Sequence, residues 1–429
     1  MQVSSRVRAL GAAAVLAALS AQAVLAQQPS PSSSYMQRLK DAEAGVAALP
    51  ASAWDATGSP EKSAALRPFI SPLQSLGTQR AFAGDTAGAI AAFDAVERAR
   101  SARRLESAAE ARIVDESGVE DALQAIVAQA RTRRVVLLNE GHNMPMHRAF
   151  SQRVARELRK IGYSYLACET FESGSPQAFS RGYVNQDGGY YTRDPVFGAW
   201  ITEAIAGGWK LVAYESGAPD PAMSPEQRLL AREETQASNL VERIFARDKN
   251  AKVLIHVGYG HLYKGSLKRP SGTEMLMMGE HLRRMTGLDT LHVDQTQFYA
   301  HPDAADDSPL YARMLAKPGT AAPFVLKSKD GEYAVLHGHK ARVDMQVVFP
   351  RYAFRDQGGR PEWLASLAGR QPREIPPQLL PGSGRRAVLA HRAGAPADAV
   401  PADVVLVEAG KPVPKLMLPH GEYRFTAED

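Results

Sequence analysis

Helix-length and strand-length apolar segments alternate along the middle of the chain. Short, mostly apolar runs predict strands at residues 135–138, 166–168, 211–214, 253–257 and 291–293. After the first of these runs, Phe150, Val154 and Leu158 recur at helical spacing behind Pro145, which suits a first helical turn. Strand, helix and strand in repetition predict βαβ units, and therefore an α/β fold around a mainly parallel sheet with flanking helices.

The two ends of the chain differ in pattern from this core, which we place at residues 119–300. Helical signals dominate residues 27–118, where residues 76–93 have the pattern of one tetratricopeptide-like hairpin. A single copy cannot stack into a solenoid, so we expect a small helical region rather than a peptide-binding array. Short apolar segments between Gly/Pro-rich turns predict a β-rich C-terminal region at residues 301–429, with an edge strand at residues 421–425.

Three further segments of the core have distinct patterns. Ser224 begins a capping box that predicts the start of a helix. Apolar residues from Met275 to Met285 recur at helical spacing, where methionines usually fill a core. Residues 170–195 form a Gly- and Tyr-rich insertion after a strand that ends in a carboxylate. This insertion is predicted to be either a lid over a site or a disordered excursion.

The first residues are typical of an export signal. Arg6 and Arg8 precede an apolar stretch at residues 9–21, and small residues provide a cleavage site by residue 26. We therefore expect residues 1–26 to be a signal peptide that sends the chain to a bacterial periplasm. The stretch is short for a membrane span and no second candidate follows, so no transmembrane segment is expected in the mature chain.

Composition narrows the classes of partner. The net charge of +5 over 429 residues is modest, and its densest basic cluster, residues 131–134, is predicted to be a solvated junction between a helix and a strand. This gives no case for DNA or RNA binding and leaves a small-molecule substrate or ligand as the expected partner. The single cysteine, Cys168, excludes an intrachain disulfide, and its apolar surroundings favour a buried inert thiol over a nucleophile.

Reactive side chains follow the first predicted strand. Glu140 and His142 stand at its end, and His147 lies in the first turn of the next helix. Ligands of open α/β sheets bind outside the carboxyl ends of the strands, so the three side chains are expected to reach one pocket. A carboxylate can orient an imidazole as a general base near neutral pH. The same set could instead hold Zn or Mn, which lowers the pKa of bound water to about 7. His147 could also simply pack its helix.

Later strands end in similar groups. Glu169 and Glu215 each follow a predicted strand, and His261 follows residues 258–260, whose glycines permit a close approach of the backbone. Carboxylates gathered in a cleft raise one another's pKa or share a cation. Arg232 could bind a carboxylate or an oxyanion, although the sequence alone favours a surface ion pair.

No nucleophile elbow, phosphate-binding loop or dinucleotide fingerprint occurs in the chain. His337 and His339 alternate in the C-terminal region at a spacing that permits metal binding. No carboxylate accompanies them in the pattern, so the sequence favours two surface histidines.

In combination these motifs resemble one superfamily, which joins erythromycin esterase-like proteins, ChaN-type haem-uptake proteins and TraB/Tiki proteins. The motifs lie between residues 135 and 294, at 138–142, 168–169, 232–233 with Asn239, and 258–261. The resemblance implies an α/β core with glutamates and histidines gathered at one end. Esterase-like members are thought to activate water with a histidine–glutamate pair, Tiki-type members are metal-dependent peptidases, and ChaN-type members bind haem.

The resemblance also implies roles for single residues. Glu140 and His142 match the superfamily's first Glu-x-His-type motif, and Glu169 matches the glutamate that ends the second strand. His261 matches the histidine of a Gly-x-x-His-like motif, and Arg232 the arginine of the esterases' helical Arg-Asp motif. The chain departs from the superfamily pattern at Asn139, Glu215 and Glu233.

Three functional hypotheses follow. The leading one is an exported hydrolase of an ester, lactone or amide bond, in which Glu140, His142, Glu169 and His261 form the site and Arg232 steadies the oxyanion. A metal that assists this chemistry would be held by Glu140, His142, His147 and His261. The alternative is a protein that binds haem or a similar planar ligand through Tyr190, Tyr191 or a histidine, with the methionine stripe as an apolar wall. The third is a scaffold with a degenerate site.

Overall fold

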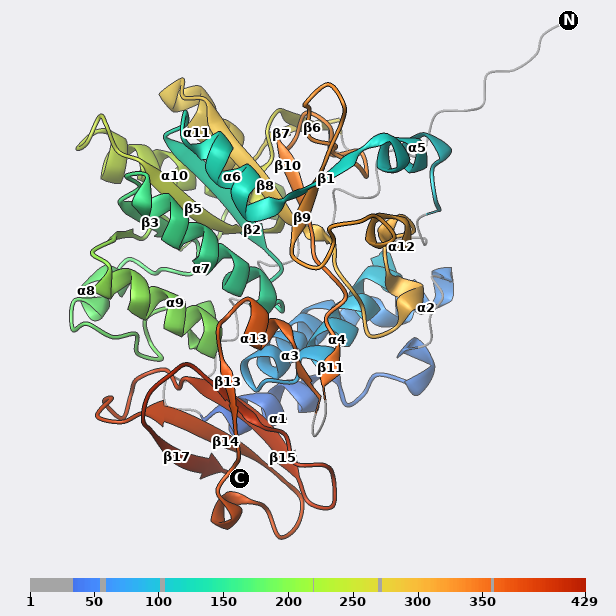
Figure 1. Ribbon diagram of the computed structural model, residues 1–429, viewed down its shortest axis with the longest axis vertical. Helices are drawn as coiled ribbons and strands as arrows, with labels where there is room; N and C mark the ends of the chain where they lie inside the picture. Colours follow the sequence, from blue (N-terminus) through green and yellow to red (C-terminus); the bar gives the residue numbers. More distant parts are fainter. Residues whose placement is uncertain (1–33, 55–58, 101–104, 219, 269–271, 356–358) are drawn as a thin grey trace, which may run out of the picture.

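The computed structural model describes residues 34–54, 59–100, 105–218, 220–268, 272–355 and 359–429. The expected signal peptide, residues 1–26, lies outside this part. An eight-stranded sheet with the order β1-β9-β10-β8-β2-β5-β3-β4 crosses the core (Figure 1). Its parallel strands are β2 (Val135–Glu140), β3 (Tyr165–Cys168), β4 (Lys210–Val212), β5 (Val253–Gly258), β8 (Thr290–Phe298) and β10 (Met345–Val348). The predicted α/β class with a mainly parallel sheet is therefore confirmed.

Two antiparallel strands complete the sheet, and one of them, like β10, comes from beyond residue 300. They are β1 (Gly118–Asp121) and β9 (Phe324–Lys327). The sheet thus draws two strands from the region for which the sequence predicts short strands. Strands β10, β9 and β1 extend the sheet beyond β8. As a result, β8 is an inner strand of the sheet rather than an edge strand.

Helices cover both faces of the sheet because neighbouring strand residues point to opposite sides. In β2, Val136 and Leu138 pack in one hydrophobic cluster with α6 (Ala122–Ala130), α7 (Pro145–Lys160) and α9 (Pro195–Ala206). Val135 and Leu137 pack in a second cluster with α10 (Pro225–Leu240) and α11 (Met278–Thr286). Cys168 is fully buried in the first cluster, and burial raises the pKa of its thiol, as expected for an inert cysteine.

Two helices of the core begin at the residues that the sequence predicts. Pro145 is in the first turn of α7, and Ser224 and Gln227 form the capping box of α10.

The methionine stripe was predicted to be wholly helical, and this is wrong. Met275 lies in strand β7 (Glu274–Leu276), which pairs with β6 (Ser266–Lys268), and the helix begins only at Met278. Spacing cannot distinguish the two states in so short an apolar run.

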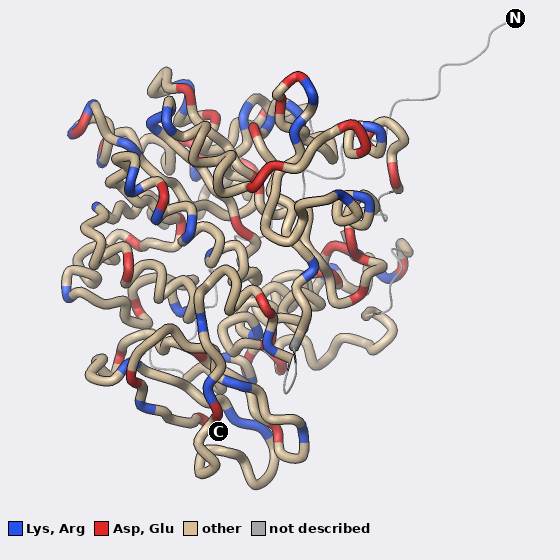
Figure 2. The backbone as a smooth tube through the Cα atoms, viewed as in Figure 1, with Lys and Arg blue, Asp and Glu red and all other residues tan. Residues whose placement is uncertain are grey.

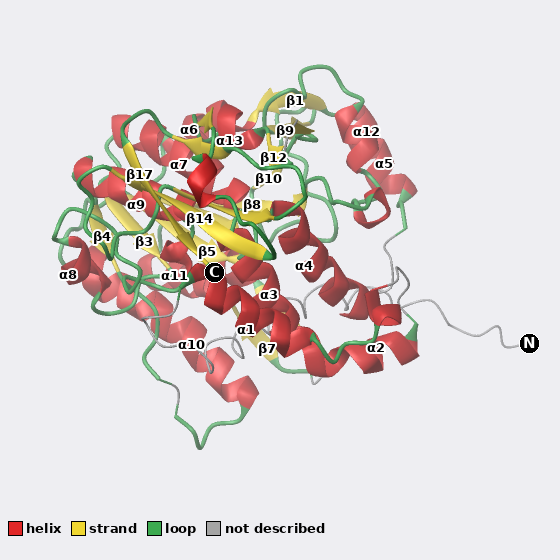
Figure 3. Cartoon of the chain, turned by 90° about the horizontal axis from the view of Figure 1, so that it is seen from below, coloured by secondary structure: helices red, strands yellow, loops and turns green. Residues whose placement is uncertain are grey.

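The first four N-terminal helices and the C-terminal strands pack together below the core sheet, whereas the fifth N-terminal helix packs against strand β9 (Figures 1 and 3). Helices α3 and α4 form the predicted hairpin. The N-terminal helices are α1 (Tyr35–Val46), α2 (Pro60–Leu66), α3 (Ile70–Phe82), α4 (Thr86–Arg100) and α5 (Ala108–Glu116). A three-stranded antiparallel sheet has the order β15-β14-β17, and its strands are β14 (Arg385–Arg392), β15 (Asp403–Glu408) and β17 (Tyr423–Glu428). The predicted closing strand is therefore an edge strand.

Shorter elements connect these parts. They are α8 (Ser175–Phe179), α12 (Tyr311–Leu315), α13 (Trp363–Ser366), β11 (Phe354–Arg355), β12 (Arg360–Pro361), β13 (Gln371–Arg373) and β16 (Leu416–Leu418). Basic and acidic residues are interspersed along the chain, in keeping with its small net charge (Figure 2). None of the helices in the described part of the chain has the length and apolar character needed to span a membrane.

Candidate active site

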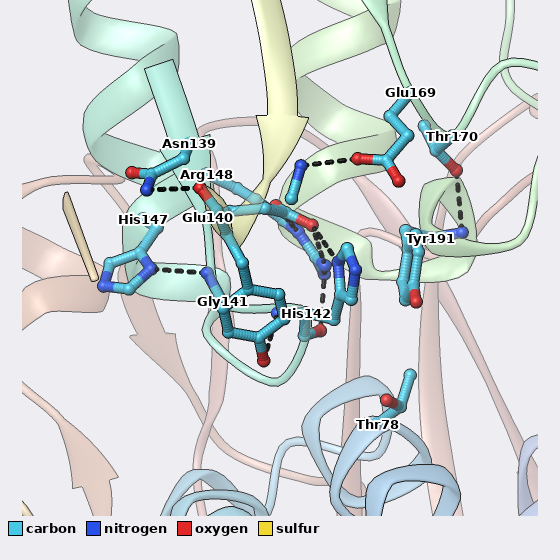
Figure 4. Close-up of polar contacts among 12 residues, drawn as sticks. Thr78, Asn139, Glu140, Gly141, His142, His147, Arg148, Glu169, Thr170 and Tyr191 are labelled. Carbon is cyan, nitrogen blue, oxygen red and sulfur yellow. Dashed lines mark hydrogen bonds and ion pairs between the residues drawn. The ribbon is translucent and has the colours of Figure 1, made fainter. Parts of the chain in front are cut away.

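The register of the parallel strands builds the first half of the site. Glu140, the last residue of β2, pairs with Gly258, the last residue of β5. The chain then turns so that the Nδ1 atom of His142 lies 3.2 Å from Oε1 of Glu140 (Figure 4). Arg148, from the start of α7, donates to both oxygens of Glu140, at 2.6 and 2.8 Å. The sequence therefore predicted the Glu140–His142 pair correctly as neighbours.

Arg148 fixes the charge of this pair. Glu140 is only 2% exposed, and burial alone would raise its pKa. The Arg148 guanidinium and the His142 ring reverse this effect and hold the pKa of Glu140 well below its ordinary value. A carboxylate at Nδ1 makes that nitrogen the hydrogen-bond donor, so the Nε2 atom of His142 is free to act as a base.

Arg148 was not predicted from the sequence, because little in the local pattern distinguishes it from a surface residue. The residue stands next to His147 on α7, in a helix whose arginines are otherwise typical of a solvated face. In the structure it is fully buried, where an arginine persists only with partners. His256 was also missed. It lies on β5 with Nε2 3.7 Å from Oε2 of Glu140, and burial lowers the pKa of this histidine to about 4.

The second half of the site follows β3 and β4. Arg232, on α10, donates to Glu169 at 2.7 Å and to both oxygens of Glu215, one of them at 3.0 Å. Its side chain is only 11% exposed, so the expected surface ion pair is wrong. The sequence pattern could not show that α10 presents this arginine to the ends of two strands. Gln236 supports Glu215 from the next turn of the helix, at 3.0 Å.

His261 completes this half and is held by a buried carboxylate. Its Nδ1 atom lies 2.5 Å from Oε1 of Glu233, whose other oxygen accepts the backbone N–H of Met278. Burial lowers the pKa of His261, but Glu233 and Glu169 more than offset this and raise it above the ordinary value. The Nε2 atom faces Arg232 at 3.1 Å and Glu169 at 3.8 Å. An unprotonated Nε2 can accept from Arg232, and a protonated one can face Glu169, so the ring has a partner in either state.

Gly258 forms the floor between the two halves. Its N–H donates to Oε2 of Glu169 at 2.5 Å. A Cβ atom at Gly258 would lie against Cε1 of His142, 2.8 Å from its Nε2 and 3.1 Å from Oε2 of Glu169. The His142 ring therefore packs directly on this glycine, beside the carboxylate of Glu169, and a larger residue at position 258 would displace it. The next residue, Tyr259, has a φ of 41°, a strained conformation of the kind that concentrates at functional sites.

The four residues proposed as metal ligands do not converge. The Nδ1 atom of His147 accepts the N–H of Gly141 at 3.1 Å, and its ring packs on Tyr299 and Phe349, away from His142 (Figure 4). Arg148 occupies both oxygens of Glu140. Within the described ranges, no three His, Cys, Asp or Glu side chains are grouped so that they could hold a metal ion. The arrangement therefore does not fit a divalent metal, because His147 points away from His142 and Arg148 holds both oxygens of Glu140.

The two tyrosines of the insertion take different positions. The Tyr191 ring stacks on the His142 ring with centroids 4.2 Å apart, whereas the Tyr190 hydroxyl accepts from Gln79 of α3 at 3.0 Å. Tyr190 packs with the N-terminal helices, and Met278 packs on the opposite side of the core sheet. The groups named for haem binding thus do not face one common space. The insertion contains the short helix α8 and covers one face of the His142 ring through Tyr191, and its role as a lid stays a prediction.

The prediction of surface histidines at His337 and His339 is wrong for the second one. His339 is buried, and its Nδ1 atom lies 3.3 Å from Oδ2 of Asp294. Asp294 ends the predicted strand at residues 291–293, far from His339 in the sequence, so the pattern around the histidines could not reveal their carboxylate. The backbone at His337 has a φ of 58°, in the left-handed region.

Comparisons with known proteins give distant structural similarities only. No protein-family model matches the chain, and no curated protein matches it. The type III effector HopBA1 is 14% identical, with a TM-score of 0.31 over 55% of this chain and 98% of that one. RRSP, a MARTX toxin effector domain from Vibrio vulnificus, is 19% identical, with a TM-score of 0.28 over 61% of this chain and 55% of that one.

A third similar structure is the C-terminal region of Pasteurella multocida toxin, described as having a thiol-protease-like catalytic triad. It is 10% identical, with a TM-score of 0.33 over 82% of this chain and 55% of that one. The similar structures are therefore bacterial effector and toxin domains. At these identities and TM-scores, the function of this chain has to be argued from its own residues.

Proposed function

We propose that this protein is a hydrolase that cleaves an ester, lactone or amide bond with water activated by the Glu140–His142 pair. One observation carries the proposal. The Nδ1 atom of His142 faces Glu140, whose charge Arg148 balances, and the His142 ring lies against Gly258 beside the carboxylate of Glu169. A water molecule that donates a hydrogen to Nε2 of His142 would be activated by this pair for attack on a carbonyl carbon.

In the first step, His142 takes a proton from the attacking water through Nε2. The imidazolium that forms is stabilised by Glu140, which Arg148 keeps ionised. A positioned general base of this kind typically contributes about a hundred- to ten-thousand-fold in rate. The Tyr191 ring on the face of His142 limits rotation of the imidazole and shields it from bulk water.

In the second step, the leaving group needs a proton. His261 can supply it, because Glu233 and Glu169 raise its pKa and favour the protonated ring near neutral pH. Arg232 provides positive charge beside the oxyanion, although its own contacts with Glu169 and Glu215 are strong. His142 thus acts as the base and His261 as the acid. Glu140 orients the first ring and Glu233 the second.

The experiment is turnover of a panel of nitrophenyl esters, lactones and aryl amides by the purified chain, before and after treatment with a chelator. The proposal expects at least one class to be cleaved, with no loss of rate after chelation because no metal is needed. A rate that chelation abolishes and Zn or Mn restores would contradict the Glu–His mechanism. The haem alternative remains a prediction, and a haemin titration without a saturable Soret shift would remove it.

A further inference from the structure

The proposed catalytic groups are closed off in this structure. Glu140 and His261 are each 2% exposed and His142 is 5% exposed. A substrate larger than water therefore cannot reach them unless part of the protein moves. The insertion covers the His142 face through Tyr191, so it is the part whose movement would open this side of the site.

The insertion is held from several sides. Tyr35 of α1 donates to the carbonyl of Arg193 at 2.8 Å, and Gln79 of α3 donates to Tyr190. On the other side, the N–H of Gln186 donates to the carbonyl of Asp398, in the loop between β14 and β15. The N-terminal helices and the C-terminal strands, which lie outside the core, thus share a role: both hold the insertion.

A buried ion pair connects the end of the insertion to Glu140. Asp194 is fully buried and caps α9, accepting the N–H groups of Val196 and Phe197 through Oδ1. Its other oxygen, Oδ2, lies 3.1 Å from Nη1 of Arg148. The remaining donors of the same guanidinium bind Glu140 and, at 2.9 Å, the carbonyl of His142.

The aromatic rings of the insertion and of α9 pack around this guanidinium. The central carbon of Arg148 lies 5.5 Å from the centre of the Tyr191 ring and 5.1 Å from the centre of the Phe197 ring. One arginine therefore joins the insertion, the strand end and the catalytic loop. If the insertion left, Arg148 would lose the Asp194 carboxylate and the Tyr191 ring face, and the charge balance around Glu140 would change.

We propose that residues 170–195 are a lid, and that Asp194 and Arg148 are positioning residues that couple its closure to the placement of Glu140 and His142. The catalytic pair is then fully aligned only when the lid is closed over a bound substrate. This coupling is a property of the fold, and it holds whichever reaction the site performs. Its test can therefore succeed or fail independently of hydrolysis.

Hydrogen exchange of the unmodified full chain tests the coupling first. In the lid, the amides of Tyr191 and Asp194 donate to other lid residues, and that of Gln186 donates to Asp398. In the catalytic loop, the amide of Met144 donates to Gly141, and that of Gly141 donates to the His147 ring. The proposal expects both groups to exchange through one opening event, with the same opening free energy and well before β2 and β5. Opening free energies that differ by more than about tenfold in equilibrium constant would overturn it.

Two variants sharpen the result. Asp194→Asn keeps an oxygen for the α9 cap but removes the charge that faces Arg148, so lid exchange should accelerate about tenfold or more. The matched control is Tyr183→Phe, which removes a hydrogen bond to Asp398 near the surface of the same lid and should leave exchange of the catalytic loop unchanged. Equal exchange in Asp194→Asn and the unmodified chain would contradict the proposal.

Arg148→Lys tests the bridge itself. A lysine ammonium retains the charge but lacks the planar fork, so it can satisfy Glu140 or Asp194 but not both. The lid and the catalytic loop should then open with different free energies, and kcat should fall more than KM rises because alignment rather than binding is lost. Persistent joint opening in this variant would show that Arg148 does not couple the two segments.

Discussion

Two carboxylate–imidazole pairs lie at the same end of the core sheet, and they differ in what surrounds them. Glu140 ends β2, Asp294 lies in the neighbouring strand β8 just beyond the residues that pair with β2, and both are buried. A histidine Nδ1 atom faces each carboxylate, His142 at 3.2 Å and His339 at 3.3 Å. By pattern and distance alone, the two pairs are equivalent.

Their neighbours separate them. The charge of Glu140 is balanced by the buried Arg148. The ring of its partner, His142, lies against Gly258 beside the carboxylate of Glu169. Asp294 is balanced by neutral donors, the side-chain amide of Asn139 at 2.8 Å and the backbone and hydroxyl of Thr296. The Glu140–His142 pair therefore adjoins further charged groups, Glu169 and Arg232. The Asp294–His339 pair instead connects β2, β8 and the loop that carries His339. A strand-end carboxylate with a histidine becomes a candidate catalytic pair only through the groups beyond the imidazole.

The largest expected effect separates the two carboxylates by activity. Glu140→Gln should lower kcat about a hundred- to ten-thousand-fold on any substrate that the panel identifies, because the base loses its orienting charge. Asp294→Asn should change kcat by less than about threefold, since Asp294 supports structure rather than chemistry. Similar losses of kcat in the two variants would break the distinction.

The next effect concerns stability. Arg148→Met leaves Glu140 and Asp194 buried without their cation, which should cost about 3–5 kcal/mol in the free energy of urea unfolding. Adding Glu140→Gln to this variant removes one of the stranded charges and should restore part of the loss. A single variant as stable as the unmodified chain would mean that Arg148 is not what balances the pair.

A smaller effect is expected at the floor of the site. Gly258→Ala places a methyl group against His142 and Glu169, at a cost of roughly 1–3 kcal/mol in stability. Turnover should fall further than this cost suggests, because the methyl group displaces the His142 ring from Glu140. The control is Gly217→Ala, since a Cβ atom there would meet no neighbour within 4 Å. Full activity of Gly258→Ala would contradict the need for His142 to lie against this glycine.

The smallest effect is in the acid stability of the Asp294 pair. Burial raises the pKa of Asp294, but hydrogen bonds from His339, Thr296 and Asn139 lower it to about 2, against about 3.9 in an unfolded chain. Asp294 therefore stabilises the fold above about pH 4, and this contribution is lost as the pH falls toward 2. The Asp294→Asn variant should show a flatter loss of stability over this range. An unchanged acid limb in equilibrium unfolding would contradict this assignment.

The sequence predicted the elements that depend on local pattern. The parallel strands, the capping box at Ser224 and the placement of Glu140, Glu169 and His261 at strand ends all follow from apolar spacing and from the rule that strand ends meet at one edge.

 The contacts that decide function join residues far apart in the chain. Arg148 with Asp194, Glu233 with His261 and Asp294 with His339 arise from how helices and loops pack, and no local pattern encodes them.

The most direct test compares the two histidines in one assay. His142→Gln and His339→Gln are each assayed against the ester, lactone or amide that the unmodified chain cleaves best, and circular dichroism confirms that both variants are folded. We expect His142→Gln to lose at least about a hundredfold in kcat, while His339→Gln keeps its activity to within about threefold. Undiminished turnover in His142→Gln would contradict the assignment of the catalytic base, and with it the proposed hydrolytic site.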